Sequence, residues 1–367
     1  MNMQAIGVSA HLAVAEVAPL IADGIHFGLA EAFYHADSAL GSTGLKDLID
    51  NAPDYWWSSW MNPAREPEKE TPAKVFGRAV HKCVLEGRDA FEAAYAPSPE
   101  PDDYPEHLRT MDDLRAFLAD TGMSKSGTKD ELILRVKGVS GCPPIYEDVV
   151  SAFEKSKKLP LKRDEFNRIL AASAFIRANS YLRDAFTGGQ AEVSVFWTAD
   201  GIRYKARFDY LKMRAIADLK SIRNPLNKSF VQACRERIAS LDYVISAAHY
   251  MDARRRMAGF VKAGLVYGAP DTEQFRSWLI QVSGITEFAF VFVFWQAEGA
   301  PISHGFKISP GNPLLDSAKH SIAKAVWNYQ RFMEEFGTSA AWVPSTPLDE
   351  LDETDLPVWW QQKQLKG

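Results

Sequence analysis

Residues 191–222 carry an alternation of hydrophobic and polar side chains that predicts three successive β-strands. The predicted strands are Glu192 to Thr198, Ile202 to Asp209, and Ala215 to Ile222. Asp200 and Gly201 separate the first two strands, and this pair is typical of a two-residue hairpin turn. Two further strands are predicted at 288–295 and 301–308, and the first is hydrophobic enough to be buried on both faces.

Hydrophobic residues spaced three or four apart predict helices on both sides of these strands. The predicted helical stretches are 42–50, 75–85, 146–186, 229–257 and 314–336. Proline-rich stretches at 61–72 and 96–105 predict a loop and a stiff, extended linker. The expected fold class is α/β, with a central mixed sheet flanked by helices.

Three carboxylates and one lysine stand at positions that the predicted sheet would bring together. Side chains alternate across a strand, so Asp218 and Lys220 share one face of the third strand while Leu219 points to the other. If the second strand pairs antiparallel with the third, Asp209 lies near the same face, and Glu192 approaches from the first strand. The alternative is a solvated sheet face with an ordinary pair of Asp218 and Lys220, the common meaning of a lone Asp-x-Lys.

Carboxylates this close together repel one another unless a cation balances their charge. Each raises the pKa of its neighbour, and a hard divalent cation with oxygen ligands, such as Mg²⁺, removes that penalty. Such a cation polarises a phosphoryl oxygen and lowers the pKa of a bound water, while a lysine orients or deprotonates that water. The cluster therefore predicts phosphodiester hydrolysis, with Glu192, Asp209, Asp218 and Lys220 as catalytic residues.

Composition and charge fit a globular protein that is not coated with nucleic acid over its whole surface. The chain has 367 residues, 46% of them hydrophobic, and a formal net charge of -5. A local basic channel is compatible with this total, because steering depends on where the charges lie. Three widely spaced cysteines without a Cys-x-x-Cys pair argue against a disulfide framework, a zinc site or a four-cysteine iron–sulfur cluster. No stretch approaches the ~20 apolar residues that span a bilayer, so we expect a cytoplasmic protein without a membrane partner.

Residues 106–140 predict a small helix-loop-helix unit inserted into the α/β domain. Thr110 and Thr128 stand where helix N-caps belong, and apolar residues follow each of them at helical spacing. The unit resembles the SAP motif, a short DNA-binding module. We expect contacts to DNA phosphates from its basic residues Lys125, Lys129 and Arg135. The alternative is a spacer hairpin whose charges are solvated.

The acidic residues and the lysine, in their order along the chain, resemble the PD-(D/E)xK nuclease superfamily, in particular its RecE-like and RecB-like exonucleases. The G-x-x-x-H stretch of that family resembles Val75 to His81. The resemblance implies that His81, Asp209, Asp218 and the backbone carbonyl of Leu219 ligate Mg²⁺, with Mn²⁺ as a substitute. It also implies that Glu192 is a ligand or a water-mediated contact, and that Lys220 positions or activates the attacking water.

The family's Gln-x-x-x-Tyr, which supports the site and its DNA, is matched in part. Tyr250 stands at the tyrosine position within the predicted helix 229–257. Ser246 stands where the family has glutamine, and a serine is too short to make the same reach. This difference puts the efficiency of the site in doubt more than its existence.

For the whole chain, the resemblance implies an exonuclease that degrades one strand of linear duplex DNA from its 5′ end. In that family the 3′ overhang passes to a single-strand annealing protein, ring-shaped oligomers occur, and the genes serve phage recombination. Two alternatives stay open, a weak or inactive DNA-binding protein of the same fold and an endonuclease of the same superfamily. The expected organisation is a nuclease domain at 1–105 and 141–340, the insert at 106–140, and an acidic, aromatic tail at 341–367.

Overall fold

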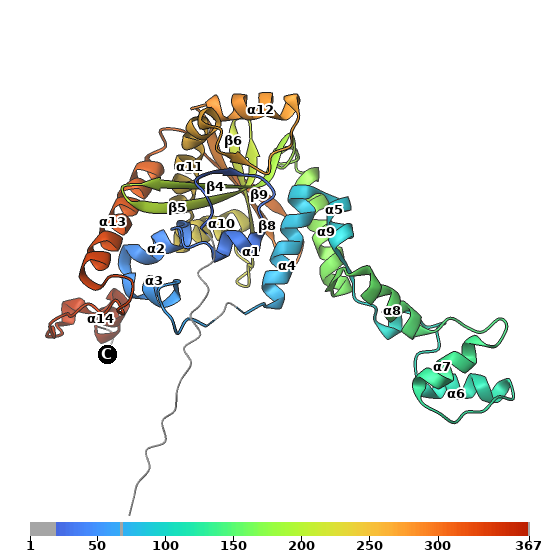
Figure 1. Ribbon diagram of the computed structural model, residues 1–367. Coiled ribbons are helices and arrows are strands. Elements are labelled where there is room, and N and C mark those ends of the chain that lie inside the picture. The colour runs from blue at the N-terminus through green and yellow to red at the C-terminus, as the bar shows by residue number, and fades with distance from the viewer. Residues whose placement is uncertain (1–19, 67–68, 366–367) are drawn as a thin grey trace, which may run out of the picture. The chain divides into compact units, whose positions relative to one another are not determined.

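A seven-stranded mixed β-sheet forms the centre of the fold (Figure 1). The computed structural model describes residues 20–66 and 69–365. In spatial order, the strands are β7 (Val266–Tyr267), β1 (Gly24–His26), β4 (Gly189–Ala199), β5 (Ile202–Lys212), β6 (Ala215–Ile222), β8 (Ala289–Gln296) and β9 (Ser303–Ile308). The predicted α/β class with a central mixed sheet is confirmed.

Strands β4, β5 and β6 form the antiparallel meander that the pattern of 191–222 predicts. The turn between β4 and β5 is made by Asp200 and Gly201, which both have positive φ angles, 50° and 75°. Two positive φ angles are the mark of the tight turn that matches the twist of a hairpin. Strand β6 also pairs parallel with β8, so the chain crosses over through helices between these two strands.

Helices cover both faces of the sheet (Figure 1). One face carries α4 (Pro72–His81), the π-helical turn η1 (Lys82–Glu86), α5 (Arg88–Ala94) and α9 (Arg163–Ala178). The crossover from β6 to β8 contains α10 (Phe230–Ser240), α11 (Tyr243–Ala263) and α12 (Glu273–Gly284). Helix α11 packs on the other face, where Tyr243 and Tyr250 contact phenylalanines of β8.

Strand β8 is buried on both faces, as its hydrophobic run predicts. Phe290 and Phe292 point towards α11, whereas Val293 and Trp295 pack in the cluster under α4 and α9. All four side chains are almost fully removed from water. Since burying one large apolar side chain contributes ~1.5–3 kcal/mol, this strand anchors the helices on both sides of the sheet.

One predicted helix is wrong in detail, and one predicted helical stretch contains a strand and ends earlier than expected. The helix predicted at 229–257 is two helices, α10 and α11, because the backbone of Asp242 turns into the left-handed region between them (φ 47°). The stretch predicted at 146–186 is α8 (Tyr146–Ser156) and α9, separated by the short strand β3 (Leu159–Leu161). Strands β1 and β7 are not predicted from the sequence, because runs of two or three residues are too short to show an alternation.

The linker predicted at 96–105 is extended, but it begins as a paired strand. Strand β2 (Tyr95–Pro97) pairs parallel with β3, and the 3₁₀ turn η2 (Pro101–Asp103) follows it. The Arg163 side chain at the start of α9 donates two hydrogen bonds to Asp103 Oδ2, at 2.9 and 2.7 Å. The linker is therefore held against the start of α9.

The insert predicted at 106–140 is a pair of capped helices with a small core of its own. Helices α6 (Met111–Asp120) and α7 (Lys129–Lys137) each begin with a complete capping box, in which Thr110 and Thr128 are the N-caps. Such caps contribute about 1 kcal/mol each. The buried core consists of Leu114, Leu118, Leu132, Val136 and Ile145. The predicted helices and caps are confirmed.

The chain divides into two compact units. Residues 20–42 and 69–319 form the unit that contains the sheet, and residues 43–66 and 320–365 belong to the second unit. Its helices are α2 (Ser42–Asp50), α3 (Ala52–Ser58), the later part of α13 (Pro313–Phe336) and α14 (Val358–Gln364), with a 3₁₀ turn η3 (Glu353–Asp355). The Asn328 side chain donates to the carbonyl of Leu48 at 2.7 Å, and the Trp342 ring is buried against Tyr55. Within the described parts of both units, no helix is long and apolar enough to cross a membrane.

Candidate metal centre

A cavity of about 460 Å³ opens in the sheet unit where strands β4 and β5 meet the helices. Its lining draws on α4, α11, both strands and the short helix α1 (Glu31–Ala36). Four of the residues that line it are predicted site residues: His81, Glu192, Asp209 and Tyr250. The fold therefore brings residues far apart in the sequence to one cavity.

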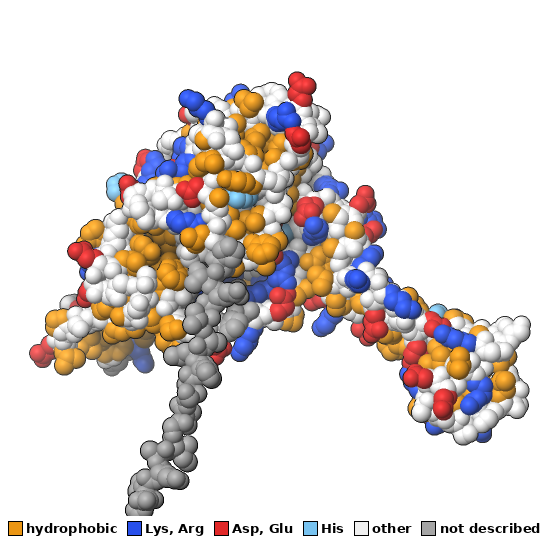
Figure 2. All heavy atoms as spheres, viewed as in Figure 1, with side chains coloured by type: hydrophobic (Ala, Val, Ile, Leu, Met, Phe, Trp, Pro, Cys, Tyr) orange, Lys and Arg blue, Asp and Glu red, His pale blue; other side chains and the backbone are white. Residues whose placement is uncertain are grey.

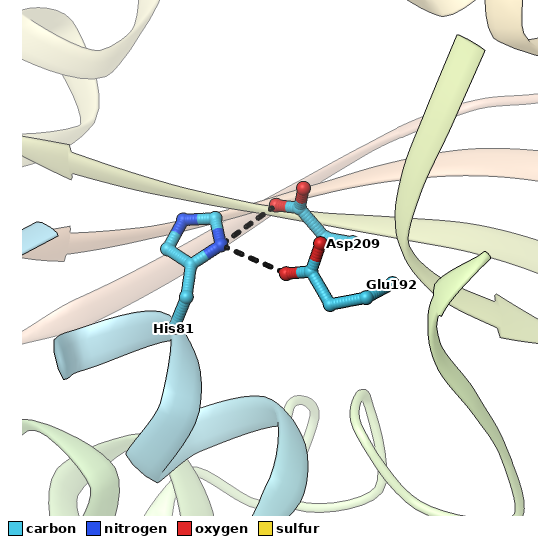
Figure 3. Close-up of side chains that lie close together, drawn as sticks. All are labelled: His81, Glu192 and Asp209. Atoms are coloured by element: carbon cyan, nitrogen blue, oxygen red, sulfur yellow. Dashed lines mark ion pairs between the residues drawn. The ribbon is translucent and has the colours of Figure 1, made fainter. Parts of the chain in front are cut away.

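His81, Glu192 and Asp209 present potential metal ligands that all lie within 4.8 Å of one another (Figure 3). Nδ1 of His81 is 3.6 Å from Oε1 of Glu192 and 4.0 Å from Oδ2 of Asp209. Figure 3 shows the imidazole reaching from its helix towards the two carboxylates. One nitrogen and two carboxylate oxygens at this spacing can share a cation.

Glu192 reaches this position through an unusual backbone conformation. The pairing of β4 with β5 is regular on both sides of it, so Glu192 lies across from Asp209, but its own φ is 55°. For a residue with a side chain this left-handed conformation is uncommon and costs on the order of 1–3 kcal/mol. The outlier coincides with the carboxylate cluster.

Arg207 holds the Glu192 carboxylate from the neighbouring strand. Nε of Arg207 donates to Oε2 of Glu192 at 2.6 Å, and its Nη1 donates to the carbonyl of Leu29 at 2.9 Å. The guanidinium leaves Oε1 of Glu192 to face His81. Arg207 is absent from the predicted site, although the sequence carries a signal for it. It stands two positions before Asp209 and therefore on the same face of β5.

Asp218 and Lys220 lie on the next strand, and their side chains form an ion pair. Nζ of Lys220 is 2.6 Å from Oδ2 of Asp218, which is 2% exposed as a residue. The pairing of β5 with β6 ends at Tyr210 and Ala217, and Asp209 and Asp218 are the next residues of the two strands. The backbone N–H of Leu219 donates to Oδ2 of Asp209 at 2.7 Å. The structure therefore brings Asp218 and Lys220 next to Asp209, while Glu192 lies close to Asp209 from the other side.

The pKa values of His81, Glu192 and Asp209 are set by opposing effects of burial and of neighbouring charges. Burial, followed by the carboxylate of Asp218, raises the pKa of Asp209 to about 6. Burial also opposes ionisation of Glu192, but the contacts with His81 and Arg207 outweigh it and lower the Glu192 pKa. Burial alone would lower the pKa of His81, whereas Asp209 and Glu192 raise it overall. A divalent cation would relieve the repulsion that raises the Asp209 pKa.

Lys220 is held as a cation in this arrangement. Burial works to lower its pKa, but the carboxylates of Asp218 and Asp209 outweigh burial and raise it. Its Nζ also lies 5.2 Å from the centre of the Tyr243 ring, a cation–π contact. A protonated lysine can orient a water or balance negative charge, so the geometry favours the orienting role over proton abstraction.

Of the two α11 residues expected to support the site, the cavity lining includes Tyr250. Burial, and then the Asp218 carboxylate, raises the Tyr250 pKa to about 12, so its hydroxyl stays protonated. Ser246 lies one turn earlier and is buried in the helix packing. His249 does not replace the family's glutamine, since its Nε2 lies 2.9 Å from the carbonyl oxygen of Lys205 and its ring packs on Trp197.

Two of the basic residues expected to bind DNA in the insert make contacts within the protein. Arg135 donates to the carbonyl of Ser126 at 3.0 Å, and so fixes the loop between α6 and α7. Lys129 pairs with Glu147, while the Lys125 side chain is exposed. On the face seen in Figure 2, basic and acidic side chains are interspersed over these helices. The structure therefore places Lys125 in the most open position of the three.

Comparison with known proteins identifies one family. The sequence profile of a family described as a PDDEXK-like domain of unknown function (DUF3799) matches residues 58–267. No curated protein matches the chain. Among solved structures, a presumed exonuclease from Eubacterium rectale is 13% identical with a TM-score of 0.41, and the alignment covers 80% of this chain and 82% of that one. At 13% identity, two proteins can differ in activity.

The profile match spans more than half of the chain, and the carboxylate cluster lies inside it. The matched residues run from before the G-x-x-x-H stretch to the end of β7, and thus include His81, Glu192, Asp209, Asp218 and Lys220. The mixed sheet, the flanking helices and the Asp-x-Lys on a central strand all fit such a domain. The chain therefore belongs to the family of PDDEXK-like domains of unknown function (DUF3799), within the PD-(D/E)xK nuclease superfamily.

Proposed function

We propose that this chain is a metal-dependent nuclease that hydrolyses phosphodiester bonds of linear duplex DNA from an end. The observation that carries the proposal is the convergence of the His81, Glu192 and Asp209 ligand atoms within 4.8 Å, beside the ion pair of Asp218 and Lys220. Family membership supports it, because PDDEXK nucleases generally use divalent metals.

The ligand atoms suit Mg²⁺, with Mn²⁺ as a substitute. Two carboxylates supply hard oxygen ligands, and the imidazole of His81 is a ligand that Mn²⁺ accepts more readily than Mg²⁺ does. The family resemblance adds Asp218 and the carbonyl of Leu219, which lie on the adjoining strand. A cation bound here would supply Lewis acidity towards a phosphoryl oxygen and would lower the pKa of a bound water.

The remaining residues of the site orient and balance charge. Lys220, held as a cation by Asp218, positions the attacking water and offsets the negative charge that develops on the phosphoryl group. Arg207 fixes the rotamer of Glu192, so that Oε1 faces the metal position. The protonated hydroxyl of Tyr250 on the cavity wall is a hydrogen-bond donor for a phosphate oxygen.

The RecE-like resemblance extends the proposal to polarity and partners. The enzyme degrades one strand in the 5′ to 3′ direction and leaves a 3′ overhang for a single-strand annealing protein. It acts as a homo-oligomer on double-stranded DNA ends, and the SAP-like insert adds affinity through exposed cations such as Lys125.

Digestion of end-labelled DNA tests the proposal. Linear duplexes labelled at either the 5′ or the 3′ end, and a covalently closed circle, are incubated with Mg²⁺, with Mn²⁺ and with chelator. We expect metal-dependent loss of the linear DNA, with the 5′ label released first. Lys220→Met should reduce the rate about 100-fold or more, since positioned charge and proton control contribute that much. Lys228→Met, which removes an exposed lysine paired with Glu236, is the matched control.

The possible results separate the proposed function from its alternatives. Cleavage of the closed circle would identify an endonuclease of the same superfamily. Binding of DNA without any metal-dependent hydrolysis would identify a DNA-binding protein that keeps the fold. An unchanged rate of hydrolysis in Lys220→Met would show that this site does not catalyse the reaction.

A further inference from the structure

Arg78 lines the same cavity as the candidate metal centre, one helical turn before His81. Both residues belong to α4, and both share the cavity wall with Glu192 and Asp209. Side chains three positions apart on a helix lie on one face, with their Cβ atoms ~5–6 Å apart. A strand whose scissile phosphate lies at the metal centre therefore places a neighbouring phosphate within reach of the long Arg78 side chain.

Arg78 pairs with two glutamates that come from other segments, and its side chain also contacts Tyr95 on the cavity wall. Its Nη2 pairs with Glu70, which precedes α4, and its Nε lies 3.8 Å from Oε2 of Glu31 in α1. The Arg78 side chain is 33% exposed, whereas those of Glu31 and Glu70 are 46% and 61% exposed. Exposed ion pairs contribute little net stability, so another anion can displace these glutamates.

The two other lysine and arginine side chains on this wall pair with carboxylates that are less exposed than Glu31 and Glu70. Arg207 is bonded to Glu192 at 2.6 Å, and Lys82 is bonded to Glu86 at 2.6 Å, one turn along the same helical segment. Beside Arg78, the wall is open at Gly77, where an added Cβ would meet no atom of the described residues within 4 Å. Arg78 thus combines a displaceable pairing with open space next to it.

We propose that Arg78 binds a phosphate of the nucleic-acid strand in the cavity, and that Glu31 and Glu70 occupy its guanidinium until that strand enters. The planar guanidinium fork suits two phosphate oxygens at once, as it suits a carboxylate. Glu31 and Glu70 therefore act as competitors of the substrate and weaken binding to other anions. This inference rests on the proposed function, since it assigns a substrate contact beside the same metal centre.

Binding measured by fluorescence anisotropy tests the inference without hydrolysis. The probe is a short labelled duplex in EDTA, prepared with and without a 5′-phosphate, at several salt concentrations. We expect Arg78→Gln to bind about tenfold more weakly and to lower the slope of log affinity against log salt by about one. Glu31→Gln should bind about threefold more tightly, because it removes a competing carboxylate. Arg88→Gln removes an equal charge and an exposed pair with Glu92, outside the cavity lining, and should match the wild type.

Each result decides a separate point. An equal loss with both probes assigns an internal phosphodiester, and a loss confined to the phosphorylated probe assigns the terminal phosphate. Unchanged affinity and salt slope in Arg78→Gln would overturn the inference, and so would a Glu31→Gln protein that binds no more tightly. Glu31→Gln also keeps the test valid if circular dichroism shows that Arg78→Gln is unfolded. A wild type that neither binds nor digests DNA refutes the proposed function itself.

Discussion

Replacing Asp209 with asparagine should make the metal-free protein more stable and abolish its activity. Burial and the Asp218 carboxylate raise the pKa of Asp209 to about 6, from an ordinary value of 3.8. Each pKa unit corresponds to 1.36 kcal/mol, so an ionised Asp209 destabilises the folded state by up to ~3 kcal/mol. Asparagine has the same shape, and its oxygen can still accept the N–H of Leu219.

The sign of the pH dependence follows from the raised pKa. The folded chain binds the Asp209 proton more tightly than the unfolded chain, so this stabilisation is complete below pH 3.8 and is lost as the pH rises through about 6. We therefore expect Asp209→Asn and the wild type to differ little near pH 4. Near pH 8, the variant should be more stable by ~1–3 kcal/mol.

Urea unfolding in EDTA, followed by tryptophan fluorescence at pH 4, 6 and 8, measures this difference. Asp271→Asn, which removes an exposed aspartate paired with Arg276, is the control and should change stability little at any pH. Added Mg²⁺ should stabilise the wild type and not Asp209→Asn, because only a chain with the ligand binds the ion. An Asp209→Asn protein that is less stable than the wild type at pH 8 in EDTA, or that gains equally from Mg²⁺, would falsify the carboxylate-cluster reasoning.

Three further predictions concern residues around the site. Arg207→Gln should lower kcat about tenfold or more and leave DNA affinity in EDTA nearly unchanged. Arg207→Lys should recover part of the rate. Equal losses of affinity and rate would contradict a positioning role for Arg207. Gly77→Ala should stabilise α4 by up to ~1 kcal/mol in thermal unfolding, yet raise KM, because the new methyl group enters the cavity wall; an unchanged KM would show that DNA does not approach there. Burial lowers the pKa of His249 to about 4. As the pH falls from 6.5 to 4, the unfolded chain therefore binds a proton at His249 that the folded chain does not bind. The stability that this group contributes should therefore drop by about 3 kcal/mol over that range. In urea unfolding at pH 7 and pH 4.5, His249→Gln should lose less stability at the lower pH than the wild type does. Equal losses of stability would argue against a neutral buried imidazole.

Local sequence patterns were sufficient to predict the strands of the site and the residues that share a strand face. The alternation along 191–222 determines three strands, and the period of two then determines which side chains share a face. This is sufficient to bring Asp209 towards Asp218 and Lys220, and the structure has them adjacent. The hairpin turn at Asp200 and the caps of the insert are local in the same sense, and they too are where the sequence predicts them.

The rest depends on contacts between distant segments, which no local pattern records. The break at Asp242 and the strands β1 and β7 are stabilised by packing and by neighbouring strands rather than by propensity. The distance of His81 from Glu192 depends on how α4 docks on the sheet, and only the resemblance to a family pointed to it. Likewise, the pairing of Lys129 with Glu147 joins the insert to α8, so a count of basic residues overstates how many are available to DNA.

The geometry at Glu192 depends both on local strand register and on contacts between distant segments. Its position opposite Asp209 follows from strand register, but its left-handed backbone is intrinsically unfavourable by on the order of 1–3 kcal/mol and needs support from elsewhere. Arg207 supplies that support through Oε2, and the same contact turns Oε1 towards His81. A regular strand with a neutral side chain at this position would be more stable, as would a cluster with fewer carboxylates. The proposed cation between His81, Glu192 and Asp209 would account for both the unfavourable backbone and the repelling carboxylates, because its binding would stabilise the folded state.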